Sequence, residues 1–308
     1  MRCTQNKQQG IALLTVLLVV VLATIAAIGM TSRQQIDIRR TENILRNEQM
    51  YLYLLGAEDW AKQILAKDSK DNQIDTFTDD WATQLPPIPI DGGVISGALE
   101  DMQGRFNLNS LFIDGDLDKE NFARFKRLLQ VLELPPQLAE TLVDWLDANE
   151  QARPQGAEDN YYLNNEFPYR TANGEMASSS ELLYISGFDF ESVQRLKPYI
   201  AALPGNTAIN INTSSAEVIA CLAEGITLES AKQLVDERGT EGYASIEEFI
   251  KHRLFTGKEL KKENLTVVSA HFILSAQVTM GQSQSQLKSL MKRVNTNIVV
   301  MQRAQGDI

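Results

Sequence analysis

The sequence is poor in cysteine and histidine, the residues on which many metal sites and nucleophilic enzymes depend. Its 308 residues include two cysteines, Cys3 and Cys221, and two histidines, His252 and His271. The histidines lie in unrelated contexts, so no histidine-based metal site and no catalytic triad is indicated. Acidic pairs are abundant, but such pairs arise by chance on an acidic chain, and no cleft can be assigned to them. We therefore predict that the protein is not an enzyme. A membrane-tethered hydrolase is kept as the last of three possible functions, behind the two that are argued below.

Basic residues are scarce relative to acidic ones. Lysine and arginine total 29 against 40 aspartates and glutamates, which gives a formal net charge of −11 at pH 7. A surface of this sign repels the phosphate backbone of nucleic acids and is compatible with divalent cations. We therefore expect no nucleic-acid partner.

Charge is absent altogether from Ile11 to Ser32, where most residues are leucine, valine, isoleucine or alanine. A helix over such a run can span the ~30 Å hydrocarbon core of a bilayer while satisfying its own backbone hydrogen bonds. The run is too long for the apolar core of a signal peptide, and no clear cleavage site follows it. Because Arg2 and Lys7 precede it, the positive-inside rule predicts a single-pass anchor with the rest of the chain outside the cytoplasm.

The junction between the polar leader and the apolar run, Gly10-Ile11, resembles the type IV prepilin cleavage motif. In that family a prepilin peptidase cuts after the glycine and methylates the new N-terminus. The resemblance implies that residues 1–10 are a leader and that Ile11 is the first mature residue. Loss of the leader would remove two positive charges and Cys3, leaving Cys221 alone. We expect that thiol to be buried as a small apolar group on a helix.

Thr15 occupies the fifth mature position, where major pilins and pseudopilins usually carry glutamate. A carboxylate in lipid is costly unless it is paired, and in filaments it is thought to pair with the N-terminal amine of a neighbouring subunit. A subunit with no neighbour ahead of it has no amine to neutralise. The threonine therefore argues either against a pilin or for a subunit at the filament tip.

The remaining patterns predict an α+β fold in which a pilin-like helix packs on an antiparallel sheet. The sequence stays compatible with one helix from Thr31 to Ala66, and an apolar stripe along it is typical of packing on a folded body. Residues 67–91 are acidic and then proline-rich, which indicates a loop. Strand patterns cover 94–101, 266–279 and 287–303, with a polar turn over 281–286.

The intervening segment has the pattern of a large all-α insertion. The predicted helices cover 119–134, 136–148, 179–184, 190–203, 215–223, 228–238 and 246–254. The predicted domains are a leader (1–10), a transmembrane helix (11–32), the stem helix with the first strands (33–105), the inserted helical domain (106–264) and a C-terminal β-hairpin (265–308).

The insertion contains an internal echo. The segment Phe106-Asn107-Leu108-Asn109-Ser110 is matched by Ile209-Asn210-Ile211-Asn212-Thr213, and two helices follow each copy. These segments resemble helix-hairpin-helix (SAM-like) units, which makes a signal-anchored periplasmic DNA-binding protein the alternative function. Glu224 at the tip of one predicted turn and the acidic surroundings disfavour phosphate binding.

Oxygen ligands are most concentrated around Asp144 and Asp147, which lie three residues apart on one predicted helix face. The segment Gly156-Ala157-Glu158-Asp159 could return the chain to them as a loop. Hard cations such as Ca²⁺ bind six to eight oxygens of this kind. A helix end followed by a solvated acidic loop is the alternative interpretation.

Several segments resemble blocks of the K-type minor pseudopilin of type II secretion systems. These are Trp145-Leu146-Asp147, the run from Gly156 to Tyr162, Pro168-Tyr169-Arg170 and the run from Met176 to Leu182. The resemblance covers nearly the whole chain, and K-type members also lack the glutamate that Thr15 replaces. It implies a calcium site that uses Glu158 and Asp159, with Asp144, Asp147 and Glu181 as further candidate ligands.

The same resemblance implies a location and a set of partners. The protein would sit in the bacterial inner membrane with its body in the periplasm. It would join the I- and J-type minor pseudopilins in a complex at the pseudopilus tip that helps to initiate assembly. Prepilin peptidase, the other pseudopilins and the inner-membrane assembly platform would be its remaining partners.

Processing at Gly10-Ile11 gives a first testable prediction. Mass spectrometry of the N-terminus of the membrane-extracted protein should show that residues 1–10 are missing and that Ile11 carries a methyl group. An intact Met1 on the membrane-inserted protein would contradict the prepilin route.

Overall fold

The computed structural model describes residues 9–84, 86–258 and 260–305. They form two compact units, the first ending at Leu52 and the second beginning at Tyr53. A single helix, α1 (Gln9–Asp71), makes up the described part of the first unit and continues into the second. Residues 1–8 of the predicted leader lie outside the described residues.

The described part of the first unit is a helix whose N-terminal part, up to Ser32, carries no charge. An 18-residue window of α1 has a mean hydropathy of 3.1, and 0% of it is buried inside the protein. By length and composition this helix could cross a membrane, which is compatible with the predicted single-pass anchor. The hydroxyl of Thr15 donates to the carbonyl oxygen of Ala12 at 2.9 Å. The polar side chain is therefore satisfied within its own helix.

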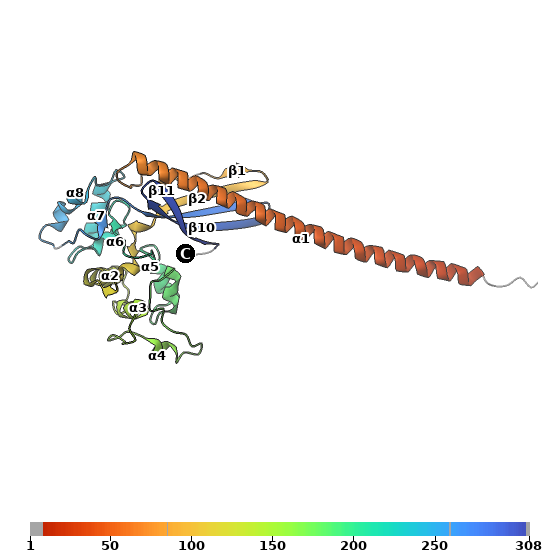
Figure 1. The fold of residues 1–308 in the computed structure, drawn as a ribbon, viewed down its shortest axis with the longest axis horizontal. Helices are drawn as coiled ribbons and strands as arrows, with labels where there is room; N and C mark the ends of the chain where they lie inside the picture. Colours follow the sequence, from red (N-terminus) through yellow and green to blue (C-terminus); the bar gives the residue numbers. More distant parts are fainter. Residues whose placement is uncertain (1–8, 85, 259, 306–308) are drawn as a thin grey trace, which may run out of the picture. The chain divides into compact units, whose positions relative to one another are not determined.

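The second unit is built on a five-stranded antiparallel sheet with the order β1-β2-β9-β10-β11 (Figure 1). Its strands are β1 (Ile88–Ile90), β2 (Gly93–Asp101), β9 (His271–Met280), β10 (Ser283–Val294) and β11 (Asn297–Ala304). The central strands β2 and β9 pair from Gly93 opposite Met280 to Asp101 opposite Phe272. The predicted antiparallel sheet is thus confirmed.

Three details of the predicted sheet are wrong. Residues 287–303 form two strands instead of one, because a two-residue turn at Asn295-Thr296 divides them. Asn295 has a φ of 57°, a left-handed conformation that asparagine tolerates in tight hairpins. The preceding turn is confined to Gly281-Gln282, since residues 283–286 belong to β10. Finally, β1 lies in the predicted loop, and its position at the sheet edge accommodates Pro89, which has no N–H to donate.

The C-terminal turns of α1 are joined to the sheet by a buried carboxylate. Glu58 accepts hydrogen bonds from the hydroxyl of Ser289 at 2.8 Å and from the guanidinium of Arg303 at 2.7 and 2.8 Å. Burial alone would raise the pKa of Glu58, but hydrogen bonds from Arg303 and Lys62 outweigh it and lower the pKa to about 2. Buried apolar residues on this part of α1 are Leu54, Ala61 and Leu65.

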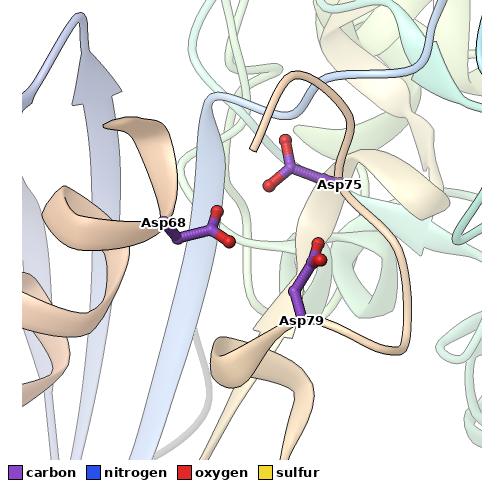
Figure 2. Close-up of side chains that lie close together, drawn as sticks. All are labelled: Asp68, Asp75 and Asp79. Carbon is purple, nitrogen blue, oxygen red and sulfur yellow. The ribbon is translucent and has the colours of Figure 1, made fainter. Parts of the chain in front are cut away.

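A second group of buried charges joins the end of α1 to the sheet. Asp68 on α1, and Asp75 and Asp79 in the loop behind it, lie close together (Figure 2). Arg293 of β10 pairs with Asp68 at 2.8 Å and with Asp75 at 3.0 Å. Asp75 also accepts the backbone N–H of Ser269 at 2.6 Å. The guanidinium therefore compensates carboxylates from two chain segments at one buried point.

Residues between β2 and β9 form the predicted insertion, and its helices gather at one end of the sheet (Figure 1). The prediction that the insertion is all-α is wrong, because short strands in it pair with one another between the helices. Its α-helices are α2 (Lys119–Val131), α3 (Leu138–Leu146), α4 (Asp159–Tyr162), α5 (Phe190–Leu196), α6 (Ala216–Ala220), α7 (Leu228–Arg238) and α8 (Ile246–Ile250). Its short strands are β3 (Phe106–Asn107), β4 (Phe112–Ile113), β5 (Asp116–Leu117), β6 (Ile200–Ala201), β7 (Ile209–Asn210) and β8 (Leu265–Thr266). The 3-10 helices of the second unit are η1 (Asp80–Ala82), η2 (Met102–Gly104), η3 (Leu108–Leu111), η4 (Ser179–Tyr184) and η5 (Arg253–Phe255).

Most predicted helices exist, with shorter bounds. The segment predicted as a helix over 190–203 is helical only to Leu196, and the chain then enters β6. Residues 179–184 form a 3-10 helix. Cys221, at the end of α6, is fully buried, and burial raises the pKa of its thiol to about 12, which confirms the expectation of a small buried group.

The internal echo in the sequence corresponds to two equivalent side-chain clamps. The Asn109 side chain accepts from the backbone N–H of Met176 at 2.8 Å and donates to the carbonyl of Met176 at 2.9 Å. The Asn212 side chain bonds the backbone of Tyr243 in the same way, at 2.7 and 3.0 Å. Parallel strand pairs also recur, β3 with β6 and β7 with β8. The insertion therefore consists of two halves with a shared plan.

The two halves differ most in one connection. In the second half, α7 ends at Arg238 and the chain reaches the clamped residue Tyr243 after a short turn. In the first half, α3 ends at Leu146 and the clamped residue is Met176. We call residues 147–175 the long loop. A connection of this length with little secondary structure is uncommon in a compact domain and is usually functional.

The buried ion pairs of Arg293 give a second testable prediction. R293M should lower the free energy of unfolding by about 3–5 kcal/mol at pH 8, because buried carboxylates lose their cation. The loss should shrink toward pH 5, since burial already raises the pKa of Asp75 to about 7 and a protonated Asp75 needs no partner. Urea unfolding of the detergent-solubilised protein at pH 8 and pH 5 measures the difference in unfolding free energy between R293M and the unaltered protein.

A matched control for R293M is R253M. Arg253 pairs with Glu237 at an exposed position, so its loss should leave the unfolding midpoint unchanged. Equal changes in the free energy of unfolding for the two substitutions would show that the buried ion pairs of Arg293 do not hold α1 on the sheet.

A candidate metal centre in the helical insertion

Helix α3 presents two acidic side chains at its C-terminal end. The nine-residue helix is amphipathic, and Asp144 lies on its buried face with 0% exposure. Asp147 is the C-terminal cap of the helix and is 8% exposed. Its side chain accepts the backbone N–H of Asn149 at 3.1 Å, which starts the long loop. The helix therefore positions Asp144, and the bond to Asn149 positions Asp147, at the point where α3 ends.

The long loop then returns to α3 and adds a third carboxylate. Gly156 approaches the Asp144 carboxylate so closely that a Cβ at this position would overlap with it. The backbone N–H of Arg153 donates to Asp144 Oδ2 at 3.0 Å. Two residues after the glycine, Glu158 is buried with 3% exposure. The loop can therefore close only because residue 156 has no side chain.

The three carboxylates converge. Asp144, Asp147 and Glu158 each offer one oxygen, and these oxygens lie within 4.8 Å of one another. Both carboxylate oxygens of Glu158 and the Oδ1 atom of Asp144 are buried without a hydrogen-bond partner among the described residues. Buried charges without partners are rare in folded proteins because their desolvation is costly. Protonation, ordered water or a cation would satisfy these oxygens.

The electrostatics of the cluster point the same way. Burial, followed by the charges of Asp144 and Asp147, raises the pKa of Glu158 to about 7. Burial also raises the pKa of Asp144 to about 6, and that of Asp147 is raised for the same reason. The guanidinium of Arg153, which is close in sequence, pairs with Glu140 at 2.8 Å. Its charge also lowers the pKa values of Asp144 and Asp147 but is outweighed by burial. In the described part of the chain, no lysine or arginine forms an ion pair with the three side chains.

The other acidic cluster, Asp68, Asp75 and Asp79, provides an internal comparison (Figure 2). There Arg293 already supplies the cation, and the two carboxylate oxygens of Asp79 accept from Asn72 at 3.1 Å and from the N–H of Thr76 at 2.7 Å. Proximity of carboxylates is thus the same in both clusters. Asp75 Oδ1 also lacks a hydrogen bond, but it lies 3.0 Å from the guanidinium of Arg293. The unpartnered oxygens of Asp144 and Glu158 have no such cation, and this distinguishes their cluster. Three carboxylates with free oxygens fit a hard divalent cation such as Ca²⁺, which prefers oxygen ligands.

The remaining predicted ligands have other partners. Asp159 accepts from the backbone N–H and the hydroxyl of Thr171, both at 3.0 Å, and pairs with Arg170 at 2.9 Å. The bond from the Thr171 N–H is the main cause of its lowered pKa. Glu181 accepts from the N–H groups of Ala177 and Ser178 and completes a capping box at η4. Asp159 and Glu181 therefore fasten the long loop and the helix behind it.

The positions singled out at the N-terminus lie together on one element. Gly10, Ile11 and Thr15 all belong to α1, and the backbone is helical across the predicted cleavage junction. The close approach of Gly156 to Asp144 was not predicted from the sequence. A glycine followed by alanine directly before the acidic pair is the signal that could have indicated it.

Comparison with known proteins gives a consistent result. Residues 104–205 and 209–270 match two family models, each described as type II secretion system (T2SS), protein K. The boundary between the matches falls between the two halves of the insertion. The chain is similar to type II secretion system protein K of Pseudomonas aeruginosa, with 36% identity over 97% of this chain and 93% of that protein. It is similar to protein K of Klebsiella pneumoniae, with 33% identity over 98% and 97%.

A solved structure supports the likeness in three dimensions. The fold superposes on a chain from the crystal structure of the GspK-GspI-GspJ complex of the enterotoxigenic Escherichia coli type 2 secretion system, with a TM-score of 0.78. The two sequences are 25% identical, and the match covers 87% of this chain and 100% of that one.

The pKa values of the cluster give a third testable prediction. Without a divalent cation, the free energy of unfolding should rise as the pH falls from about 8 to about 5. Over that range folded Glu158 and Asp144 take up protons at pH values of about 7 and 6, whereas the unfolded chain keeps them ionised until about pH 4.

Calcium should stabilise the protein at pH 7.5, by about 2.7 kcal/mol at a hundredfold excess over its Kd.

Thermal unfolding in EDTA and in calcium chloride, across this pH range, measures both effects. E158Q should remove the calcium shift and part of the pH dependence, and G156A should weaken the calcium shift by opening the loop. E166Q, at an exposed position of the same loop, is the matched control and should behave as the unaltered protein. An unchanged melting temperature on adding calcium at pH 7.5 would refute the metal centre.

Proposed function

The chain belongs to the type II secretion system protein K family, whose members are minor pseudopilins, and we propose that it forms the tip of a pseudopilus. In this proposal it assembles with the I- and J-type minor pseudopilins and helps to start the filament that exports folded periplasmic proteins. The single observation that carries the partner assignment is the superposition on a chain of the GspK-GspI-GspJ complex, at a TM-score of 0.78.

The N-terminal helix supports the membrane part of the proposal. A prepilin peptidase would cut after Gly10, and the apolar run of α1 would hold the processed subunit in the inner membrane, with the second unit in the periplasm. The hydroxyl of Thr15 bonds to the carbonyl of Ala12 and brings no charge into the lipid. A subunit of this kind needs no amine from a neighbour ahead of it, as expected for the first subunit of a filament.

The helical insertion supports a position at the end of the filament. It leaves the sheet after β2 and returns at β9, so a pilin-like sheet carries an additional helical mass at one end (Figure 1). Such a mass would obstruct the stacking of another subunit above it. The assembly platform and the other pseudopilins would then add below.

Calcium is the proposed resident ion of the insertion. Asp144, Asp147 and Glu158 would hold it, and backbone carbonyls or water would complete the six to eight oxygens that Ca²⁺ takes. The ion would neutralise carboxylates that have no cationic partner in the described chain and would join the long loop to α3. Asp159 and Glu181 remain predicted ligands only, since both carboxylates have the partners described above.

The alternative of a DNA-binding helix-hairpin-helix protein gains no support from Arg124 and Arg238, two arginines of the insertion. Arg124 is fully buried, and it donates to the carbonyl of Lys261. Arg238 is 8% exposed and donates to the carbonyls of Ile211 and Ser214 at 2.7 and 2.8 Å. Both side chains therefore hold the fold together and are not available to phosphates.

The tip position gives a fourth testable prediction. T15E places an unpaired carboxylate in the membrane, at a cost of about 3 kcal/mol, and should reduce pseudopilus initiation and reporter secretion. T15V removes the hydroxyl without adding charge and should secrete normally, which makes it the matched control. In-cell cross-linking of the unaltered protein should capture the I- and J-type subunits at the filament end. Normal function of T15E, together with cross-links along the shaft, would contradict the proposal.

A further inference from the structure

Large apolar side chains are exposed in the long loop and in the 3-10 helix η4 that follows it. Ring contacts through Tyr162 and Tyr169 connect Tyr161 of the loop with Tyr184 of η4. Three rings of these segments are unusually exposed for aromatic side chains, at 53% for Tyr161, 79% for Phe167 and 60% for Tyr184. Leu163 and Leu183 are also exposed large apolar residues of these segments. We call these five residues the aromatic face. Exposed apolar groups that gather in one region mark binding sites more often than single ones do.

A buried scaffold holds the exposed rings in place. Tyr162 is fully buried, and its ring contacts those of Trp145, Tyr161 and Tyr169 at centroid distances of 5.5, 5.3 and 5.2 Å. The hydroxyl of Tyr169 donates to the carbonyl of Tyr184 at 2.7 Å, and their rings lie 6.0 Å apart. Ordered rings lose little conformational entropy when a partner binds.

Acidic residues outnumber basic ones in the segment that carries the aromatic face. Between residues 159 and 192 the one basic residue is Arg170, which pairs with Asp159 at 2.9 Å. The other acidic residues of that segment are Glu166, Glu175, Glu181, Asp189 and Glu191. A partner surface must therefore bring positive charge to match them.

We propose that the aromatic face is a docking surface for a partner protein that presents an apolar segment flanked by lysine or arginine. Three other occupants are disfavoured by the same charges. A second copy of this chain would bring acidic residues against acidic residues, and anionic lipid and nucleic acid would be repelled in the same way. The site goes beyond the proposed assembly of minor pseudopilins.

The position of the surface in the repeat supports this assignment. The second half of the insertion has no counterpart of the long loop, since α7 is followed almost directly by the clamped Tyr243. The fold of a half therefore does not require Tyr161, Leu163 and Phe167, the three residues of the aromatic face that lie in the long loop. In Figure 1, α4, which carries Tyr161, lies at the margin of the insertion away from the sheet. Most of the aromatic face is an addition to the scaffold, and the face is accessible to a partner.

The first part of the test identifies the occupant in cells. The photoreactive residue p-benzoylphenylalanine is placed at position 167 of the full-length chain, with Phe77, 52% exposed and outside the insertion, as the control position. Mass spectrometry of the cross-linked product should give a protein peptide with apolar residues between lysines or arginines, at position 167 alone. Cross-links to lipid, to a second copy or to an acidic peptide, or no cross-link, would overturn the proposal.

The second part uses defined probes with the purified full-length protein in detergent and saturating calcium. A fluorescent peptide with an aromatic centre and lysine flanks should bind at least tenfold more tightly than its glutamate-flanked counterpart, and salt should weaken it. F167S/Y184S should lower that affinity at least tenfold at an unchanged melting temperature, whereas F77S should not. Equal binding of both peptides, or equal effects of the two variants, would refute the docking surface. Because calcium is constant, neither result depends on the metal proposal.

Discussion

The structure depends on how buried carboxylates are compensated at the joint between helix and sheet. Arg293 on β10 holds Asp68 at the end of α1 and Asp75 in the following loop. Asp101, at the end of β2, accepts hydrogen bonds from Ser269 at 2.6 Å and from Asn210 of the insertion at 3.0 Å. Burial raises the pKa values of both Asp75 and Asp101, so these bonds are needed to keep the groups in place. Helix, sheet and insertion therefore meet in one polar network.

Comparison of the two acidic clusters shows what makes a metal site plausible. Both bring three carboxylates together, and both are buried. At the joint, several N–H groups donate to the carboxylates, and Asp75 Oδ1, which accepts no hydrogen bond, faces the guanidinium of Arg293 at 3.0 Å. At the end of α3, the oxygens of Glu158 and one oxygen of Asp144 have neither a donor nor an ion-pair partner among the described residues. The two clusters therefore differ in how many hydrogen-bond donors and cations face the carboxylates, which only side-chain geometry reveals. Composition alone would have treated the two clusters alike.

The sequence was sufficient for the features that depend on local patterning. The helix over the charge-free run from Ile11 to Ser32 follows from composition and length, and it is present. The strand near residue 95 and the helix over 228–238 follow from residue patterns and are also present. Asp144, Asp147 and Glu158 could be grouped because a helix end and a glycine loop return the chain to one place. The turn at Asn295 was missed because β-branched residues on both sides extend the strand pattern. The partners of Asp159 and Glu181 depend on packing over distances that local patterns do not encode.

The way the insertion joins the sheet has a mechanical consequence. The chain leaves the sheet after Asp101 and re-enters beside it, since Asp101 lies opposite Phe272 in the β2–β9 ladder. Tension that enters along α1 can pass from β2 to β9 through their hydrogen bonds without loading the helices between them. The two halves of the insertion, with the candidate metal centre and the exposed aromatic residues, are then shielded from the force. The second unit can be pulled by its helix while the insertion keeps its shape.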